Sequence, residues 1–446
     1  MNRKTLLFLL LLAGLVRIPV FMLATRGHFI VGEGRVQIDL AENILSGRGF
    51  QLSPSMLYPS REETSEARDF QMEFYRRVDG FYGVLRPGRP TTFLVPGNAL
   101  FFAGLILLSG GTSITAILAV QLALGILTVA LGIRIASRFL SGRWLTAAGA
   151  LMAVDPFELY YEAIPATQAL FSLVLMTGLL LSIRLLEKPR AARAILAGLA
   201  WGVAFMVRPA ALPIAALVFL LSLAGHRFSR ASLAAGALLA LSFCAALLPW
   251  GLRNRAVTGE FSVIPTQGGL QLWEFNGRVF SESFRHEQRG ASLLYEPVRE
   301  RWLGRLRSPE LTEFPEFTDE SEAYRDSVLY HRQTLFLRRN PLVFLELVSL
   351  RFMEFFKPFP LNDFSVYHTI AGLLFFFWIS ALMVPGGILL MMDLDPRGIL
   401  IALGAWGYSL MHLLVASGTP HRVAIDFLLI VMAMRTLRVF WLRRRA

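Results

Sequence analysis

The sequence contains little cysteine and little charge. Cys244 is the single cysteine among 446 residues and lies in an apolar run, which excludes an internal disulfide and a cysteine-based metal cluster. Charged residues make up 17% of the chain and apolar residues 54%, and the mean hydropathy is +0.52. This composition is too apolar for a soluble protein of this size and indicates an integral membrane protein.

The apolar residues are gathered in runs that approach the length of a membrane span, about 20 residues. The runs are Leu6 to Ala24, Ile114 to Ile135, Leu145 to Leu159, Ala169 to Leu186, Ile195 to Val207, Ala211 to Ala224, Leu233 to Leu252, Ile370 to Met392, Ile399 to Val415 and Ala424 to Leu442. They predict one all-α membrane domain over residues 1–446 with about ten transmembrane helices, or roughly 9 to 13. No small-residue cleavage site follows the first run, which favours an uncleaved first span.

The positive charges predict the orientation. They cluster in short segments beside the runs: Arg3-Lys4, Arg134 to Arg143, Lys188 to Arg193, Arg227 with Arg230, and Arg443 to Arg445. The positive-inside rule places these segments and both termini in the cytoplasm. This distribution accounts for the net charge of +12 without nucleic acid as a partner.

All the basic segments reach one side only if two further apolar segments do not cross the membrane. Phe93 to Gly110 is short and punctuated by proline and glycine, and Pro341 to Phe356 contains three charged residues. We interpret both as interfacial helices. Two long polar segments, 25–92 and 253–340, then face away from the cytoplasm. Their aromatic content favours ordered, functional loops, and a helix is expected within Glu320 to Arg339.

Polar residues at this outer face are candidates for catalysis. Glu33 and Asp39 follow the first span, and a carboxylate at a membrane mouth can act as a general base. Arg253 and Arg255 follow the aromatic end of a span and have the side chain best suited to phosphate. Gly268-Gly269 would let backbone amides approach an anion. The alternatives are solvated loop charges and interfacial anchors.

Three further positions place charge beside a helix break or in a short outer turn. They are Asp155-Pro156, Arg208-Pro209, and Pro420-His421-Arg422 with Asp426 one turn further. Charges inside a membrane are costly, and they suggest function unless they reach the water interface. The histidines have no ligand spacing, so the sequence requires no metal.

Taken in order, these segments resemble a known family. Glu33 to Phe50 is similar to a first-loop signature with an acidic residue followed by A-x-N-L-L-x-G-x-G-F. Pro90 to Ala103, Ala197 to Pro209 and Pro249 to Asn276 are similar to its later motifs, and Asn340-Pro341 and His421-Arg422 fit its last landmarks. The chain thus resembles the bacterial membrane glycosyltransferases of the dolichyl-phosphate-mannose–protein mannosyltransferase-like family. These have the GT-C fold and include lipid A aminoarabinose transferases.

The resemblance implies an inverting transfer of a sugar from a polyprenyl-phosphate carrier to a lipid, glycan or protein acceptor. It places the protein in the bacterial inner membrane with its active site outside the cytoplasm. Glu33 stands at the position of the family's first-loop aspartate, which would act as the base toward the acceptor hydroxyl. Asp39 is the second candidate for this role. The implied donor-phosphate ligands are Arg253, Arg255, Arg86, Arg208 and Arg422, and the other substrate-binding residues are Asn254, Gly268, Gly269, His421 and Gln168. No cofactor is required, although some GT-C relatives use a divalent metal.

Two positions depart from the family pattern. Gln37 stands where the family has tyrosine, and Gln168 stands where it has a second acid. If the family's second acid is essential, Gln168 indicates either a divergent substrate or a scaffold without catalytic activity. A polysaccharide polymerase or ligase that uses polyprenyl-linked glycans is a close alternative. A transporter is a more distant one, because the sequence shows no internal repeat and no paired intramembrane charges.

Overall fold

The computed structural model describes residues 2–27, 32–53, 88–224, 229–276, 315, 317, 320–356, 366–416 and 418–444. Apart from one isolated bridge between Gln51 and Pro90, the regular elements in these ranges are helices. They are α1 (Arg3–Gly27), α2 (Gly32–Leu45), α4 (Gly97–Ser109), α5 (Ile114–Ala136), α6 (Gly142–Ala153), α7 (Pro156–Glu162), α8 (Gln168–Glu187), α9 (Ala191–Val207), η2 (Pro209–Ala211), α10 (Leu212–Ala224), α11 (Arg230–Thr258), α12 (Gly268–Asn276), α16 (Glu322–Arg339), α17 (Pro341–Phe356), α18 (Val366–Met392), α19 (Pro396–Leu414) and α20 (Thr419–Arg443). The predicted all-α membrane fold is confirmed.

Six of the described helices are long and apolar enough to cross a membrane: α1, α5, α8, α11, α18 and α19. Three shorter apolar helices join them: α4, α9 and the segment that contains α10. The count of about ten spans stays a prediction. The run Leu145 to Leu159 is broken in two, because the Asp155 carboxylate accepts a hydrogen bond from the Phe157 amide at 2.9 Å and starts α7 there.

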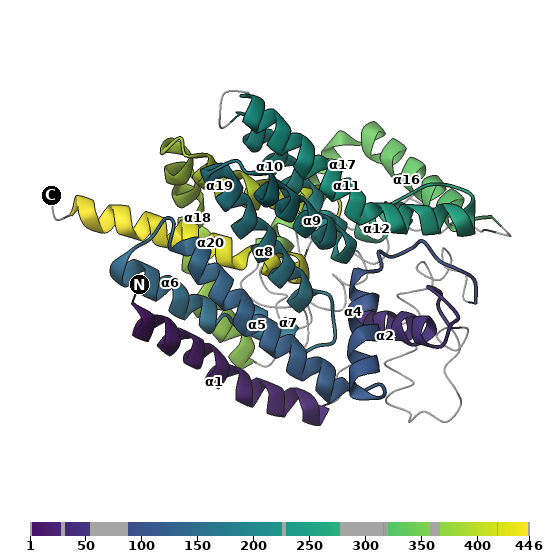
Figure 1. Ribbon diagram of the computed structural model, residues 1–446, viewed down its shortest axis with the longest axis horizontal. Coiled ribbons are helices and arrows are strands. Elements are labelled where there is room, and N and C mark those ends of the chain that lie inside the picture. The colour runs from purple at the N-terminus through teal and green to yellow at the C-terminus, as the bar shows by residue number, and fades with distance from the viewer. Residues whose placement is uncertain are drawn as a thin grey trace.

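The basic turns lie together at one end of the helix bundle, which we call the basic end. Arg138 and Arg397 both contact the Glu187 carboxylate, at 2.5 Å and 3.1 Å. Arg143 lies over the ring of Trp441. Both marked chain ends lie on this side of the molecule, while α2, α4, α12 and α16 lie at the opposite side (Figure 1). That these turns face the cytoplasm remains an expectation from the positive-inside rule.

The opposite end, which we call the loop end, is built from both long polar segments. Its hydrophobic cluster combines α2, the segment around Phe50, α11, α12 and α16, through residues that include Val36, Leu40, Phe50, Trp250, Leu270, Trp273 and Leu329. Residues from distant parts of the chain therefore share one buried core. The helix expected within Glu320 to Arg339 is present as α16, so the described parts of the loops are ordered by their own packing.

Charged residues are also buried between the helices. Arg17 of α1 contacts Glu162 of α7 at 2.6 Å, and both side chains are almost fully buried. Arg422 and Asp426 form a second buried pair on α20, at 3.0 Å. Removal of one partner from such a pair leaves an uncompensated charge, at a cost of about 3–5 kcal/mol. The first pair joins α1 to α7, whereas the second lies within α20, which Arg422 joins to α17 through the Phe355 carbonyl.

Two glycines allow α9 and α11 to approach closely. A Cβ atom on Gly198 would overlap the Ser242 hydroxyl and the Leu239 carbonyl, and one on Gly202 would lie 2.5 Å from the Ala246 Cβ. The spacing of four residues puts both glycines on one face of α9. Small residues at such positions permit the backbone contact by which membrane helices associate.

We expect Gly198→Val to push α9 away from α11 and to destabilise the protein by about 1–3 kcal/mol. Thermal unfolding of the purified protein in detergent measures the change. Gly104→Val is the matched control, because nothing lies within 4 Å of a Cβ atom there. Equal melting temperatures for the two variants would contradict the close packing of α9 against α11.

Candidate active site

The first turn of α2 brings the predicted base to the loop between α7 and α8. Glu33 lies in this turn, although its side chain lies outside the described part of the chain. A Cβ atom on the next residue, Gly34, would overlap the Pro165 carbonyl. Only glycine permits this approach, and it places the backbone of Glu33 close to Pro165, three residues before Gln168.

Asp39, the reserve base, is engaged in local hydrogen bonds. Its Oδ2 accepts from the Ser53 amide at 2.8 Å and from the Asn43 side chain at 3.2 Å. The Asn43 amide group also donates to the Gln51 carbonyl at 2.7 Å. Asp39 therefore fastens the segment after α2 to the helix, and its role as a base stays a prediction.

Arg208 lies where α8, α9 and α20 meet. Its Nε donates to the Thr167 hydroxyl at 2.8 Å, and its Nη1 donates to the Pro420 carbonyl at 3.2 Å. Gln168 follows Thr167 as the first residue of α8 and is buried. Arg208, Gln168 and the turn before α20 come from distant parts of the sequence, and the fold brings them together.

Two histidines lie beside this arginine. The rings of His412 and His421 are stacked with centroids 4.4 Å apart. Tyr408, on the same helix as His412, donates its hydroxyl to the His421 carbonyl at 3.0 Å. His412 and Tyr408 were not among the sequence candidates, since both lie inside an apolar run. The one signal that could have found them is polar residues four apart on one face of α19.

Arg422, in contrast, is surrounded by protein. It is fully buried and donates to Asp426 at 3.0 Å and to the Phe355 carbonyl at 3.2 Å. Its guanidinium carbon lies 3.6 Å from the centre of the Phe376 ring and 4.3 Å from that of Phe157. This environment resembles that of a packing residue, and a role at a phosphate stays a prediction.

Arg253 connects the two long polar segments. Its Nη1 donates to the Thr91 carbonyl at 2.7 Å, and its Nη2 donates to the Phe50 carbonyl at 2.9 Å. Asn254 accepts from Arg253 at 3.0 Å and donates to the Ser262 carbonyl at 2.7 Å. Both predicted ligands thus hold backbone carbonyls of the loop end. Arg255 is exposed, and Arg86 lies outside the described residues.

The backbone amides at Gly268-Gly269 bind the carboxylate of Asp326, a residue of α16. The Asp326 Oδ1 accepts from the amides of Gly269 and Leu270, at 2.7 Å and 3.2 Å. Burial raises the pKa of the Asp326 carboxyl above its usual value, although the backbone hydrogen bonds act in the opposite direction. A Cβ atom on Gly269 would overlap the backbone of Asp326. The amides that were predicted to bind phosphate therefore receive the α16 carboxylate.

The described residues contain no group of three or more histidine, cysteine or acidic side chains that could hold a metal ion. The stacked pair His412 and His421 supplies two imidazoles without a third ligand. Whether the protein needs a metal stays open to experiment.

Comparisons with known proteins bear on the fold. A family model for dolichyl-phosphate-mannose-protein mannosyltransferase matches residues 94–250. The oligosaccharyltransferase of Archaeoglobus fulgidus aligns in two structures. The apo form has 14% identity, a TM-score of 0.52 and coverage of 99% of this chain and 51% of its own. The form tethered with an acceptor peptide has 12% identity, a TM-score of 0.51 and coverage of 99% and 50%.

The chain has the GT-C fold. It spans about half the length of the archaeal oligosaccharyltransferase it matches. ArnT from Cupriavidus metallidurans also aligns, with 13% identity, a TM-score of 0.38 and coverage of 96% of this chain and 76% of its own. No curated protein sequence matches the chain. The resemblance read from the sequence motifs is confirmed.

The family match extends over the GT-C helices from α4 to Trp250 in α11. It therefore includes Gln168 and Arg208, and it ends before Arg253. Glu33 lies outside the matched segment, so its place in the fold is supported by the contact of Gly34 with Pro165.

We expect Arg253→Ala to loosen the two segments that this arginine connects. Loss of its hydrogen bonds to Phe50 and Thr91 should speed amide hydrogen exchange in residues 50–53 and 90–93 about tenfold, as expected for roughly 1.4 kcal/mol of local stability. Mass spectrometry of the exchanged protein measures this. Arg255→Ala is the control, because this residue is two positions away and exposed. Equal exchange rates in the two variants would show that Arg253 does not hold these segments in place.

Proposed function

We propose that the protein is an inverting glycosyltransferase of the membrane. It transfers a sugar from a polyprenyl-phosphate carrier to a lipid, glycan or protein acceptor. The observation that carries the proposal is the meeting of the α2 turn with the loop before Thr167-Gln168, beside Arg208 and His421. A candidate base and a cluster of cationic and polar groups thus come together where the first turn of α2, the loop between α7 and α8 and the start of α20 meet.

The chemistry requires two groups with opposite tasks. Glu33 takes the proton of the acceptor hydroxyl, and the acceptor oxygen attacks the anomeric carbon of the sugar. The bond from that carbon to the phosphate oxygen breaks on the opposite face, which inverts the configuration. The phosphate keeps the electron pair, and Arg208 with His421 stabilises its growing charge.

Several observations support the lipid-linked donor. The matching family model is named for a dolichyl-phosphate sugar. Exposed apolar side chains lie along the α11 helix, which ends at the loop end, among them Leu241, Leu248 and Leu252. A carrier chain can remain in the bilayer beside this surface while its phosphate reaches Arg208.

Gln168 agrees with a single-base mechanism. It occupies the place of the family's second acid, and it is buried beside the Thr167–Arg208 hydrogen bond. An uncharged amide there adds no negative charge beside Arg208. We propose that Glu33 alone serves as the base and that the reaction needs no metal. The setting is the bacterial inner membrane, with the loop end outside the cytoplasm.

An oligosaccharide donor is the second candidate. It is favoured by the fold shared with an archaeal oligosaccharyltransferase. The two candidates differ in the carrier, since one uses a monosaccharide monophosphate and the other an oligosaccharide on its lipid. Transfer assays with both carriers distinguish them.

We expect Arg208→Ala to lower transfer about 10²–10³-fold, because a donor that stabilises the developing anion is lost. The reaction is followed with purified protein in lipid nanodiscs and a radiolabelled polyprenyl-monophosphate sugar. Arg230→Ala at the basic end is the control, since this residue is exposed. If both variants retain full transfer, Arg208 is not a phosphate ligand.

We expect Glu33→Gln to lower turnover about 10²–10⁴-fold, because the amide cannot accept a proton. Gly34→Ala should also lower turnover, because the new Cβ overlaps Pro165 and moves the turn that carries Glu33. Gly104→Ala, in open space, should keep full activity. Melting temperatures show that each variant is folded, and an active, folded Glu33→Gln enzyme would exclude Glu33 as the base.

A further inference from the structure

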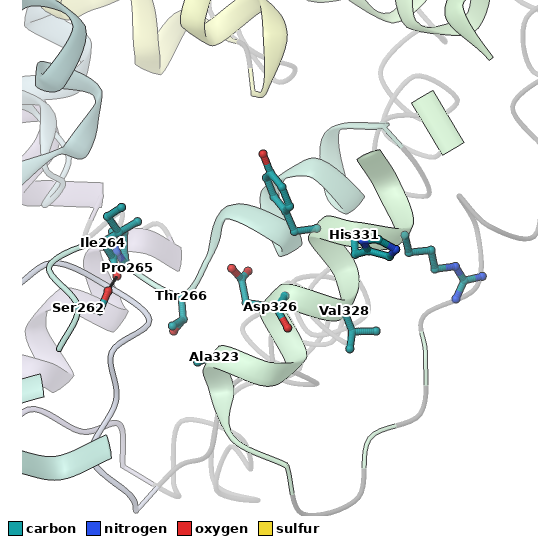
Figure 2. A pocket seen from close by; sticks show the side chains of 11 residues that line it. Ser262, Ile264, Pro265, Thr266, Ala323, Asp326, Val328 and His331 are labelled. Atoms are coloured by element: carbon teal, nitrogen blue, oxygen red, sulfur yellow. Dashed lines mark hydrogen bonds between the residues drawn. The ribbon is translucent and has the colours of Figure 1, made fainter. Parts of the chain in front are cut away.

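A pocket of about 810 Å³ lies at the loop end, beside the segment after α11 and around α16, where Asp326 points toward Thr266 while Val328 and His331 point away from it (Figure 2). Its lining is shared between those two segments: Ser262, Ile264, Pro265 and Thr266 on one side, and Ala323, Asp326, Ser327, Val328, Tyr330, His331 and Arg332 on the other. None of these residues has a part in the transfer step proposed above. The volume is within the range of small-molecule sites.

The lining has the chemistry of a carbohydrate site. Ala323, Ser327 and Tyr330 are three and four residues apart and share one face of α16. Hydroxyl groups, the Asp326 carboxylate and the His331 imidazole can exchange hydrogen bonds with sugar hydroxyls. Pro265, Val328 and the Tyr330 ring offer apolar surface for the C–H faces of a pyranose. The pocket therefore combines polar side chains with apolar surface, which suits a sugar.

The position of the pocket adds a second argument. Phe261 and Ile264, next to it in the chain, expose 54% and 64% of their surface, and they follow the last residues of α11. Large exposed apolar side chains at the end of a span are typical of the membrane interface. A molecule with a sugar headgroup and a lipid tail can therefore place the sugar in the pocket and the tail in the bilayer.

The pocket is connected to the proposed catalytic end. The Thr266 amide, in its wall, donates to the Thr92 carbonyl at 3.0 Å. The Thr92 amide donates to Glu322 of α16 at 2.9 Å, and the preceding Thr91 carbonyl accepts from Arg253. Hydrogen bonds therefore connect the pocket wall to α16 and to Arg253, whose partner Phe50 packs with α2 in the shared hydrophobic cluster.

We propose that this pocket binds the glycan headgroup of a lipid-linked acceptor. The proposal rests on the proposed function and specifies its acceptor class. A peptide acceptor is the alternative that the test below distinguishes. The α16 wall is a helix whose backbone groups bond to one another, so recognition here must use side chains.

The test uses a photoreactive alkyl glucoside with a diazirine on the sugar, added to the protein in phosphatidylcholine nanodiscs. We expect crosslinks in peptides that contain residues 262–266 or 323–332. Ser327→Trp should reduce them about tenfold or more, equivalent to about 1.4 kcal/mol of binding, because the indole fills the pocket. Leu335→Trp is the matched control: this residue is exposed on the same helix and does not line the pocket.

Three outcomes would overturn the proposal: crosslinks only outside these peptides, equal crosslinking in Ser327→Trp and Leu335→Trp, or displacement of the probe by a peptide and not by unlabelled glycoside. The Arg208→Ala variant separates this inference from the proposed function. It should crosslink like the unsubstituted protein, since the donor phosphate plays no part in glycoside binding. If the unsubstituted protein crosslinks normally but transfers sugar from neither lipid-linked donor, the glycan site is supported and the transferase proposal is removed.

Discussion

The guanidinium of Arg253 binds the backbone of two segments that the sequence separates widely. It donates to the carbonyls of Phe50 and Thr91, and Asn254 beside it holds the Ser262 carbonyl. Backbone carbonyls in a partly buried place need donors, and an arginine offers several in a fixed plane. Phe50 packs in the same hydrophobic cluster as α2 and α16, and Ser262 lines the pocket, so this connection joins the parts of the loop end.

The arginines divide into two groups by what surrounds them. Arg17, Arg253 and Arg422 bind carboxylates or backbone carbonyls in buried or partly buried places, so their charge stabilises the fold. Arg208 lies at the junction of three helices, and its partners are a hydroxyl and a carbonyl. Arg208 is half-buried at this junction, beside Gln168 and His421, and a guanidinium in such a place is suited to a substrate anion. This contrast directs the functional proposal to Arg208.

Glycines carry much of the specificity of the packing. Gly34, Gly198 and Gly269 each lie where a Cβ atom would overlap a neighbouring backbone. The first seats the turn that carries Glu33, the second brings α9 against α11, and the third seats α12 on α16. In each case the sequence shows a glycine, while the reason for it lies in a residue far along the chain.

The sequence by itself determined the membrane class, the helical fold and the order of the family motifs, because apolar runs and charge asymmetry are local properties. It also indicated Glu33, Gln168, Arg208 and His421 as candidates. It could not assign Arg253 and Gly268-Gly269, because an arginine or a glycine pair beside a span suits a phosphate and a protein group equally well. Only the tertiary structure decided that Asp326 occupies those amides, that Arg253 holds two carbonyls, and that His412 and Tyr408 join Arg208. The physical reason is that hydrogen-bond partners are chosen by proximity in space, which chain spacing does not specify.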